Sequence, residues 1–295
     1  MEAKSSELYK GKLISLFKRL VLFLDEHNLK YYATYGTLLG AVRHQGLIPW
    51  DDDVDICMPR EDYEKLLSMK KELSMYNLDL CSIHDKGYYM QLAKVHDLES
   101  TVWEFKMYPF LFGVYIDIFP LDSTNLEDEA IVKNMHRYNK YFRLYMASLC
   151  QEKTIDLFRL SVNGDFWYAL RHLFAKAFLS PFKGSLWRKV KLFEKRISSE
   201  CEGSKLINYA GVYGKKEIIP ASWFDYSVKL PFADFEVSAP AEYDSYLRHF
   251  YKDYMIYPPE DKRVFKHDCY YLNLKERLTV KQAQERVKMG IYEEI

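Results

Sequence analysis

The amino-acid sequence predicts an α/β fold of the α+β kind, in which a mixed β-sheet is flanked by helices. Two observations lead to this prediction. Apolar residues recur at helical spacing over residues 6–28 and again over 59–75. Between and after these helices lie short apolar runs of strand length, some of them alternating with polar residues. The predicted strands span residues 30–34, 53–58, 78–83, 88–95 and 113–119.

Each element has a local reason. In the first helix, Leu13, Leu20 and Leu24 share one face, and the chain turns near Asn28 before the first strand. Pro59 suits the first turn of the second helix, because its fixed φ is helical and its missing N–H would be unpaired there. The apolar face of that helix consists of Tyr63, Leu66, Leu67 and Leu73.

Composition allows an enzyme but argues against some classes. The chain has 295 residues, 48% of them hydrophobic, so it can bury a large core. Lys plus Arg and Asp plus Glu both number 42, which leaves no overall basic field for nucleic acid. The five cysteines lack Cys-x-x-Cys spacing, so we expect neither a disulfide framework nor a zinc site. We expect a cytoplasmic setting, because no signal peptide and no membrane-spanning apolar run stand out.

Three carboxylates stand in apolar strand patterns. Asp53 and Asp55 point to the same face of one predicted strand, and Asp117 lies on a later one. Neighbouring carboxylates repel unless a positive charge lies between them, and such oxygen ligands suit Mg²⁺ or Mn²⁺. Gly36 and Thr37 form a turn before a short helix, where backbone N–H groups can meet phosphate. The sequence therefore predicts a metal-dependent phosphate site.

Three other interpretations of the acidic run are less consistent with its residues. A calcium loop of the EF-hand type is disfavoured, because Ile56 stands where that loop needs glycine. A solvated acidic turn is disfavoured because the run continues into a strand and Asp117 matches it. A nucleotide-sugar glycosyltransferase generally has a nucleotide-binding half-domain before its Asp-x-Asp, yet only 52 residues precede Asp53.

A glycine turn, an Asp-x-Asp on one strand and a third acid on a later strand together resemble the nucleotidyltransferase superfamily. Residues 32–63 resemble the LicD family more closely, through Gly-Thr-Leu-Leu-Gly-Ala-Val-Arg-His, Pro-Trp-Asp-Asp-Asp-Val-Asp-Ile and Met-Pro-Arg-Glu-Asp-Tyr. Two later segments, 116–122 and 257–263, are also similar to it. The resemblance spans most of the chain and is weakest between about residues 126 and 205.

The resemblance implies a nucleotidyltransferase-like core and an enzyme that moves a phospho-alcohol, with phosphocholine as the first expectation. The donor would be CDP-linked, such as CDP-choline. The acceptor would be a hydroxyl of a bacterial surface glycan (teichoic acid, lipopolysaccharide or capsule) or its lipid-linked precursor, and CMP would leave. Asp53, Asp55 and Asp117 would hold the metal, with Asp117 also able to act as general base. Asp51 and Asp52 would support the metal site or orient the acceptor.

Alternatives within this chemistry stay open. The same acids could attach a nucleotide from an NTP and release pyrophosphate, and the group carried could be phosphoethanolamine or a polyol phosphate. A non-catalytic scaffold would be expected to lack one of the acids. For phosphate contact we expect Gly36 and Thr37 and a set of basic side chains. These are Arg43, Lys94, Lys262, Arg263 and His267.

The middle of the chain differs in character. Residues 153–196 carry ten Lys or Arg and three acids, a net charge of +7, interleaved with nine aromatic residues. Two interpretations are open: peripheral binding to an anionic membrane surface, or an ordinary helical subdomain with inward-facing aromatics. The expected organisation is a catalytic core at 1–125, a helical, basic and aromatic insertion at 126–204 that faces membrane or acceptor, and a segment at 205–295 that completes the active site.

Overall fold

The computed structural model describes residues 3–150, 170, 173–198, 203–263 and 269–295. Its main sheet is mixed, as predicted. This sheet has seven strands. β2 and β6 run parallel, and the other neighbouring pairs in this sheet are antiparallel. The central path runs β1 (Tyr32–Ala33), β2 (Asp55–Pro59), β6 (Tyr115–Thr124), β4 (Ala93–Asp97) and β3 (Leu78–Cys81). The end of β6 also pairs with β7 (Lys205–Ile207), which pairs with β8 (Ile218–Pro220).

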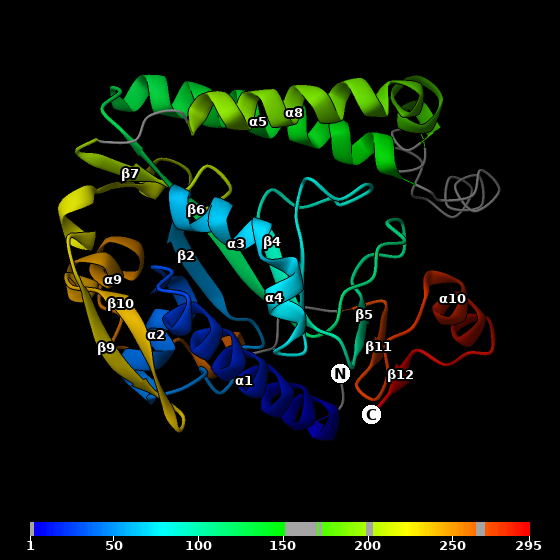
Figure 1. Ribbon diagram of the computed structural model, residues 1–295, viewed down its shortest axis with the longest axis horizontal. Coiled ribbons are helices and arrows are strands. Elements are labelled where there is room, and N and C mark those ends of the chain that lie inside the picture. Colours follow the sequence, from blue (N-terminus) through cyan, green and yellow to red (C-terminus); the bar gives the residue numbers. More distant parts are fainter. Residues whose placement is uncertain (1–2, 151–169, 171–172, 199–202, 264–268) are drawn as a thin grey trace.

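Helices flank this sheet (Figure 1). The N-terminal part contributes α1 (Ala3–Glu26), α2 (Tyr35–His44), α3 (Arg60–Ser68) and α4 (Lys70–Ser74). The later helices are α5 (Asp128–Leu149), α8 (Lys183–Ile197), α9 (Tyr243–Tyr251) and α10 (Val280–Lys288). Short helical turns are η1 (Ala175–Leu179), η2 (Ser180–Phe182), η3 (Gly214–Glu217), η4 (Ala221–Phe224) and η5 (Glu260–Lys262).

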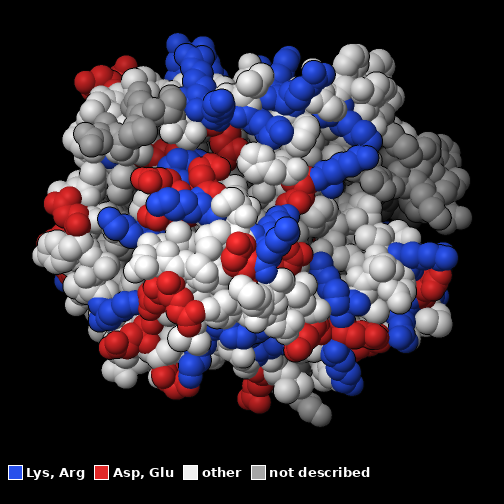
Figure 2. Space-filling view, viewed as in Figure 1, with Lys and Arg blue, Asp and Glu red and all other residues white. Residues whose placement is uncertain are grey.

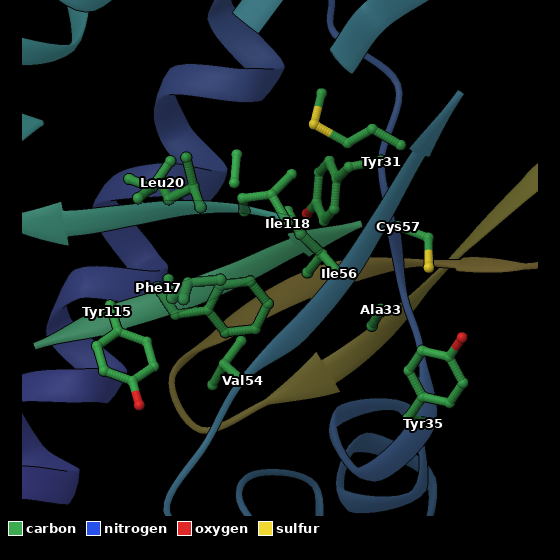
Figure 3. Packing of buried hydrophobic residues seen from close by; sticks show 14 of the residues in the cluster. Phe17, Leu20, Tyr31, Ala33, Tyr35, Val54, Ile56, Cys57, Tyr115 and Ile118 are labelled. Atoms are coloured by element: carbon green, nitrogen blue, oxygen red, sulfur yellow. The ribbon is translucent and has the colours of Figure 1, made fainter. Parts of the chain in front are cut away.

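The core lies between α1 and the central strands. Leu13, Phe17 and Leu20 on α1 are fully buried, as its predicted face requires. Figure 3 shows Phe17 and Leu20 beside Val54, Ile56 and Ile118 from β6 and the β2 segment. Alternation along β2 and β6 therefore buries one face under α1 and leaves the acidic side chains on the other.

Some predicted boundaries were wrong. The helix predicted over 59–75 is two helices, α3 and α4, separated at Met69, whose φ of −102° and ψ of 31° interrupt the helical path. Pro59 is the last residue of β2 and caps α3 rather than opening it. The strand predicted over 88–95 begins at Ala93. Aromatic residues are enriched in strands, yet the rings of Tyr88 and Tyr89 are buried in the preceding loop.

The predicted helical insertion forms a layer of its own where the structure describes it. α5 and α8 lie side by side across the top of the molecule in Figure 1. Their shared core contains Tyr138, Phe142, Leu186 and Val190. Residues 151–169, 171–172 and 199–202 lie outside the described residues. Across the residues that are described, no helix is both long enough and apolar enough to span a bilayer.

The C-terminal segment returns to the N-terminal elements, which the sequence did not predict in detail. The hairpin of β9 (Ser227–Phe232) and β10 (Phe235–Pro240) packs by β1, and the ring of Phe232 meets Phe17 edge-on at 5.2 Å. Farther along, β11 (Tyr271–Asn273) pairs with β5 (Thr101–Trp103) and with β12 (Glu293–Glu294). The division of the chain at residues 125 and 204 remains a prediction.

Candidate functional site

The start of α2 is built for close approach. Tyr35 has a φ of 47°, which is costly for a residue with a Cβ. Its hydroxyl donates to Glu217 at 2.6 Å and accepts from the Asn208 amide at 2.8 Å, which anchors the strained residue. A Cβ at Gly36 would lie 2.8 Å from Oδ2 of Asp51. The first turn of α2 and the acidic run are therefore in contact, and glycine leaves the room for it.

Thr37 ties the same turn to β2. The backbone N–H of Asp55 donates to Thr37 Oγ1 at 2.7 Å. Because the turn also touches Asp51, it contacts the acidic run at two points. Gly36 and Thr37 thus lie against the acidic run, within the first turn of α2 rather than in a turn before it. Such an end attracts anions, since its first N–H groups have no partner within the helix.

The register of the sheet aligns three functional side chains. Asp55 on β2 is directly opposite Asp117 on β6, and Asp117 is directly opposite Lys94 on β4. Residues in register on neighbouring strands point to the same face of the sheet. Asp55, Asp117 and Lys94 therefore form a row on the face opposite to α1. The strand pairing behind this row was not predicted from the sequence.

A second acidic group adjoins the row. Asp51, Asp52 and Asp53 each offer an oxygen, and the three oxygens lie within 4.8 Å of one another. Within the described part of the chain this is the one group of three acidic, histidine or cysteine side chains spaced to share an ion. Asp51 and Asp52 are thus as well placed for a metal as Asp53, a role that the sequence left undecided. The set Asp53, Asp55 and Asp117 remains a prediction.

Electrostatic crowding explains why a cation fits here. The pKa of Asp55 is raised well above its usual range, first by burial and then by the charges of Asp53, Asp117 and Asp51. Lys94 opposes that shift without cancelling it. A divalent cation among these oxygens would relieve the repulsion, and an all-carboxylate donor set suits Mg²⁺ or Mn²⁺. The residues present therefore fit such an ion.

Lys94 is buried rather than open to solvent. Its Nζ lies 2.7 Å from Asp117 Oδ1, 3.5 Å from Glu104 Oε1 and 3.4 Å from the centre of the Tyr115 ring. Burial lowers the pKa of Lys94, but the two carboxylates outweigh it and the net shift is upward. Lys94 thus carries a fixed positive charge that holds Asp117 in place. Its predicted contact with phosphate remains a prediction.

Glu104 is a participant that the sequence analysis missed. Burial raises the pKa of its carboxyl, but Lys94 and hydrogen bonds from Tyr115 and Tyr89 outweigh burial and lower it. The Tyr89 hydroxyl donates at 2.7 Å. Glu104 lies just past the end of β5, in a segment with no motif, so only the fold brings it to Lys94.

Cations from the two ends of the chain meet on two aromatic rings. The guanidinium of Arg43 lies 4.7 Å from the Tyr257 ring centre, and that of Arg263 lies 5.5 Å from the same centre. Arg263 also lies 5.3 Å from the ring of Trp50, the residue before Asp51. Burial, and then the charge of Arg263, lower the pKa of Arg43. Two cations against shared rings beside a carboxylate cluster suit a phosphate-containing ligand.

The remaining predicted cations are less informative. Lys262 is exposed, in η5, one residue before Arg263. His267 lies outside the described residues. In addition, α1 brings Lys10 close enough to Asp52 and Asp51 to be affected by their charges, and its ammonium donates to the carbonyl of Pro49. No sequence motif indicated that α1 borders the site.

Comparisons with known proteins match large parts of this chain. The model of the LicD/FKTN/FKRP nucleotidyltransferase domain matches residues 28–164. Lipopolysaccharide cholinephosphotransferase LicD of Haemophilus influenzae is 25% identical over 249 residues, which are 82% of this chain and 88% of that protein. An uncharacterized protein of Rickettsia typhi is 44% identical over 177 residues, 52% of this chain and 56% of its own length.

A shorter match points to the same group. An uncharacterized protein of Rickettsia prowazekii is 54% identical over 50 residues, 17% of this chain and 19% of its own. The resemblance read from the motifs is confirmed by the family model and by the long match to the Haemophilus influenzae protein. Residues 28–164 therefore form a nucleotidyltransferase domain of the LicD/FKTN/FKRP family, and the rest of the chain is similar to the Haemophilus influenzae protein over most of its length.

Proposed function

We propose that this protein transfers a phospho-alcohol group, phosphocholine first, from a CDP-linked donor to a hydroxyl of a bacterial surface glycan or of its lipid-linked precursor, and releases CMP. Family membership and the name of the Haemophilus influenzae relative support a transferase of this kind. The observation that carries the proposal is the row of Asp55, Asp117 and Lys94 across three strands, beside the carboxylates of residues 51–53. A lipid-linked acceptor would place the reaction at the inner face of the plasma membrane.

Mg²⁺ or Mn²⁺ held by Asp53, Asp55 and Asp117 would neutralise charge on the donor pyrophosphate. Asp51 and Asp52 are close enough to contribute oxygens as well. The backbone at Gly36 and Thr37 would receive a phosphate at the start of α2, since its N–H groups point out of the helix there. Arg43 and Arg263 would bind the remaining phosphate oxygens, with Lys262 and His267 as further candidates for the same role.

Asp117 is the proposed general base. Its carboxylate would accept the proton of the acceptor hydroxyl as that oxygen attacks the phosphorus in line with the departing CMP. Lys94 at 2.7 Å orients this carboxylate. The carboxylate of Glu104 in turn balances the positive charge of Lys94. Positioning by this buried network lowers the entropy cost of assembling the reacting groups.

Two tyrosines support choline as the alcohol. The Tyr213 ring stacks on Tyr35 at 5.8 Å between ring centres, and its hydroxyl lies 3.4 Å from that of Tyr251. Burial, followed by Tyr213 and then the charges of Asp55 and Asp51, raises the pKa of Tyr251, so this pair lies close to the acids. Tyr213 is 39% exposed and offers a ring face that could receive a quaternary ammonium.

The test is a CMP-release assay with Mg²⁺ and each of CDP-choline, CDP-ethanolamine and CDP-ribitol, with and without a panel of bacterial glycan acceptors. Metal-dependent release from one donor, lost in Asp53→Asn and kept in the exposed control Asp225→Asn, is the expected result. Release of pyrophosphate from an NTP instead would replace the proposal with nucleotide transfer. If no donor gives CMP release although the panel contains a competent acceptor, the proposed reaction would be refuted.

A further inference from the structure

Three phenylalanines near the start of α8 are exposed. Phe174, Phe178 and Phe182 are 56%, 60% and 62% exposed, and the rings of Phe174 and Phe178 stack at 4.6 Å between centres. These rings carry no polar tip, and exposing them to water is unfavourable. Large exposed apolar side chains that lie close together on a protein surface are typical of a site of interaction.

The helices that follow and pack beside this segment have many exposed cations. The exposed face of α8 consists of Arg188, Lys189, Lys195 and Arg196 around Leu192, which is 68% exposed. The acid of α8, Glu194, is buried and bound to Arg60. Exposed cations of α5 continue the charge: Lys133, Arg137, Lys140 and Arg143. Figure 2 shows Lys and Arg gathered over this upper layer of the molecule.

An apolar recess adjoins the same surface. A cavity of about 490 Å³ lies between the start of α8, the end of α5 and two loops. Aromatic rings of Tyr108, Phe110, Tyr145 and Trp187 line it, and Lys86 and Lys183 contribute two cations. Lys183, which lines the recess, directly follows the exposed Phe182 in the chain. Apolar walls with ammonium groups match an acyl chain that ends in a phosphate headgroup.

We infer that this surface, made of Phe174, Phe178, Phe182 and the exposed cations of α5 and α8, binds peripherally to an anionic phospholipid bilayer. Exposed cations meet the headgroup phosphates, and the phenylalanines and Leu192 enter the boundary between headgroups and acyl chains. Charge complementarity selects this occupant, because the outward face of α8 has cations and apolar side chains but no exposed acid. The inference is independent of the reaction proposed above.

The experiment is co-sedimentation of the full chain with phosphatidylglycerol-containing vesicles and with pure phosphatidylcholine vesicles, at low and high salt. We expect binding to the anionic vesicles alone, weakened by salt because the cations act through screened charge. Replacing Phe174, Phe178 and Phe182 by serine should reduce partitioning at least about tenfold, since each ring loses its apolar burial. The matched control replaces equally exposed apolar side chains elsewhere by serine: Met75, Tyr226 and Met289.

A charge variant keeps every aromatic ring and so tests the surface without disturbing its packing. The test is a triple variant with Arg188→Glu, Lys189→Glu and Lys195→Glu. Binding should weaken by at least about fivefold for each replaced position, because one basic residue contributes about that much at an anionic surface. The same reversal at Lys71, Lys281 and Lys288, which are exposed on other helices, should have little effect. No binding to anionic vesicles at low salt, or equal losses in test and control variants, would overturn the inference whatever the outcome of the CMP assay.

Discussion

At the scale of single residues, the carboxylate of Asp55 is buried close to other carboxylates. Burial and three nearby carboxylates raise its pKa, so the charged side chain destabilises the fold until a cation is bound. Asp55→Asn removes that charge. We expect catalytic turnover to fall by about two orders of magnitude or more, because the metal loses a ligand. We also expect the variant to unfold at the same temperature as the parent or higher in the absence of metal.

The check on Asp55 combines the CMP assay with thermal unfolding with and without Mg²⁺. The parent should be stabilised by the ion according to its occupancy, and Asp55→Asn should gain less. A variant that keeps near-normal turnover would refute the metal-binding role of this residue. A variant that is much less stable than the parent without metal would refute the crowding argument.

Lys94 behaves in the opposite way, because it is the charge that neutralises its neighbours. It is 1% exposed and lies between Asp117 and Glu104. Lys94→Met removes the cation that the two carboxylates share, which we expect to cost about 3–5 kcal/mol of unfolding free energy. The double variant Lys94→Met with Glu104→Gln should regain part of that loss. Urea unfolding of both variants measures this; equal stability of parent and Lys94→Met would contradict it.

At the scale of elements, Glu217 joins the turn of η3 to the start of α2. It accepts hydrogen bonds from the Tyr35 hydroxyl and from the backbone N–H of Tyr213. Burial raises the pKa of Glu217 to about 7, and these hydrogen bonds only partly offset the rise. As pH rises from about 4.5, the unfolded chain loses this proton before the folded one does. Stability should therefore fall between about pH 4.5 and pH 7.

Glu217→Gln isolates this effect. The variant has no proton to lose, so from pH 4 to pH 8 its stability should improve relative to the parent by up to about 3 kcal/mol, the equivalent of the pKa shift. The matched control is Glu236→Gln, at an exposed position on β10. Denaturant unfolding over the pH range supplies the measurement, and parallel pH profiles for Glu217→Gln and the parent would exclude the proposed role.

Element boundaries depended on contacts that lie outside the element itself. The helical pattern over 59–75 was correct in type, but Met69 departs from helical dihedral angles and divides the segment into α3 and α4. Tertiary packing holds the start of α3. Arg60 shows such packing: it forms two hydrogen bonds with Asp122 on β6, at 2.7 and 2.8 Å, and one with Glu194 on α8 at 3.3 Å. These partners lie 62 and 134 residues away, beyond any local pattern.

At the scale of the whole molecule, the C-terminal segment shares strands and core packing with the N-terminal one. β7 pairs with β6, the β9–β10 hairpin packs by β1, and β11 pairs with β5. A fragment of residues 1–204 would expose the faces that these strands cover, Phe17 among them. We expect this fragment to be unfolded or aggregated, because the exposed apolar area removes the main stabilising contribution. Circular dichroism and the dispersion of amide NMR chemical shifts test whether the fragment is folded. A fragment with native chemical-shift dispersion would show that the first two segments fold alone.

The sequence by itself determined the α/β class, the buried faces of α1, β2 and β6, and the family, because hydrophobic period and short motifs are local properties. The sequence also shows that Gly36 lies shortly before the acidic run along the chain. Only the tertiary structure decided that Asp55, Asp117 and Lys94 stand in register, that Glu104 and Glu217 belong to the site, and that Arg43 meets Arg263. Strand pairing and burial join residues far apart in the chain, and their energies depend on partners that no local pattern names.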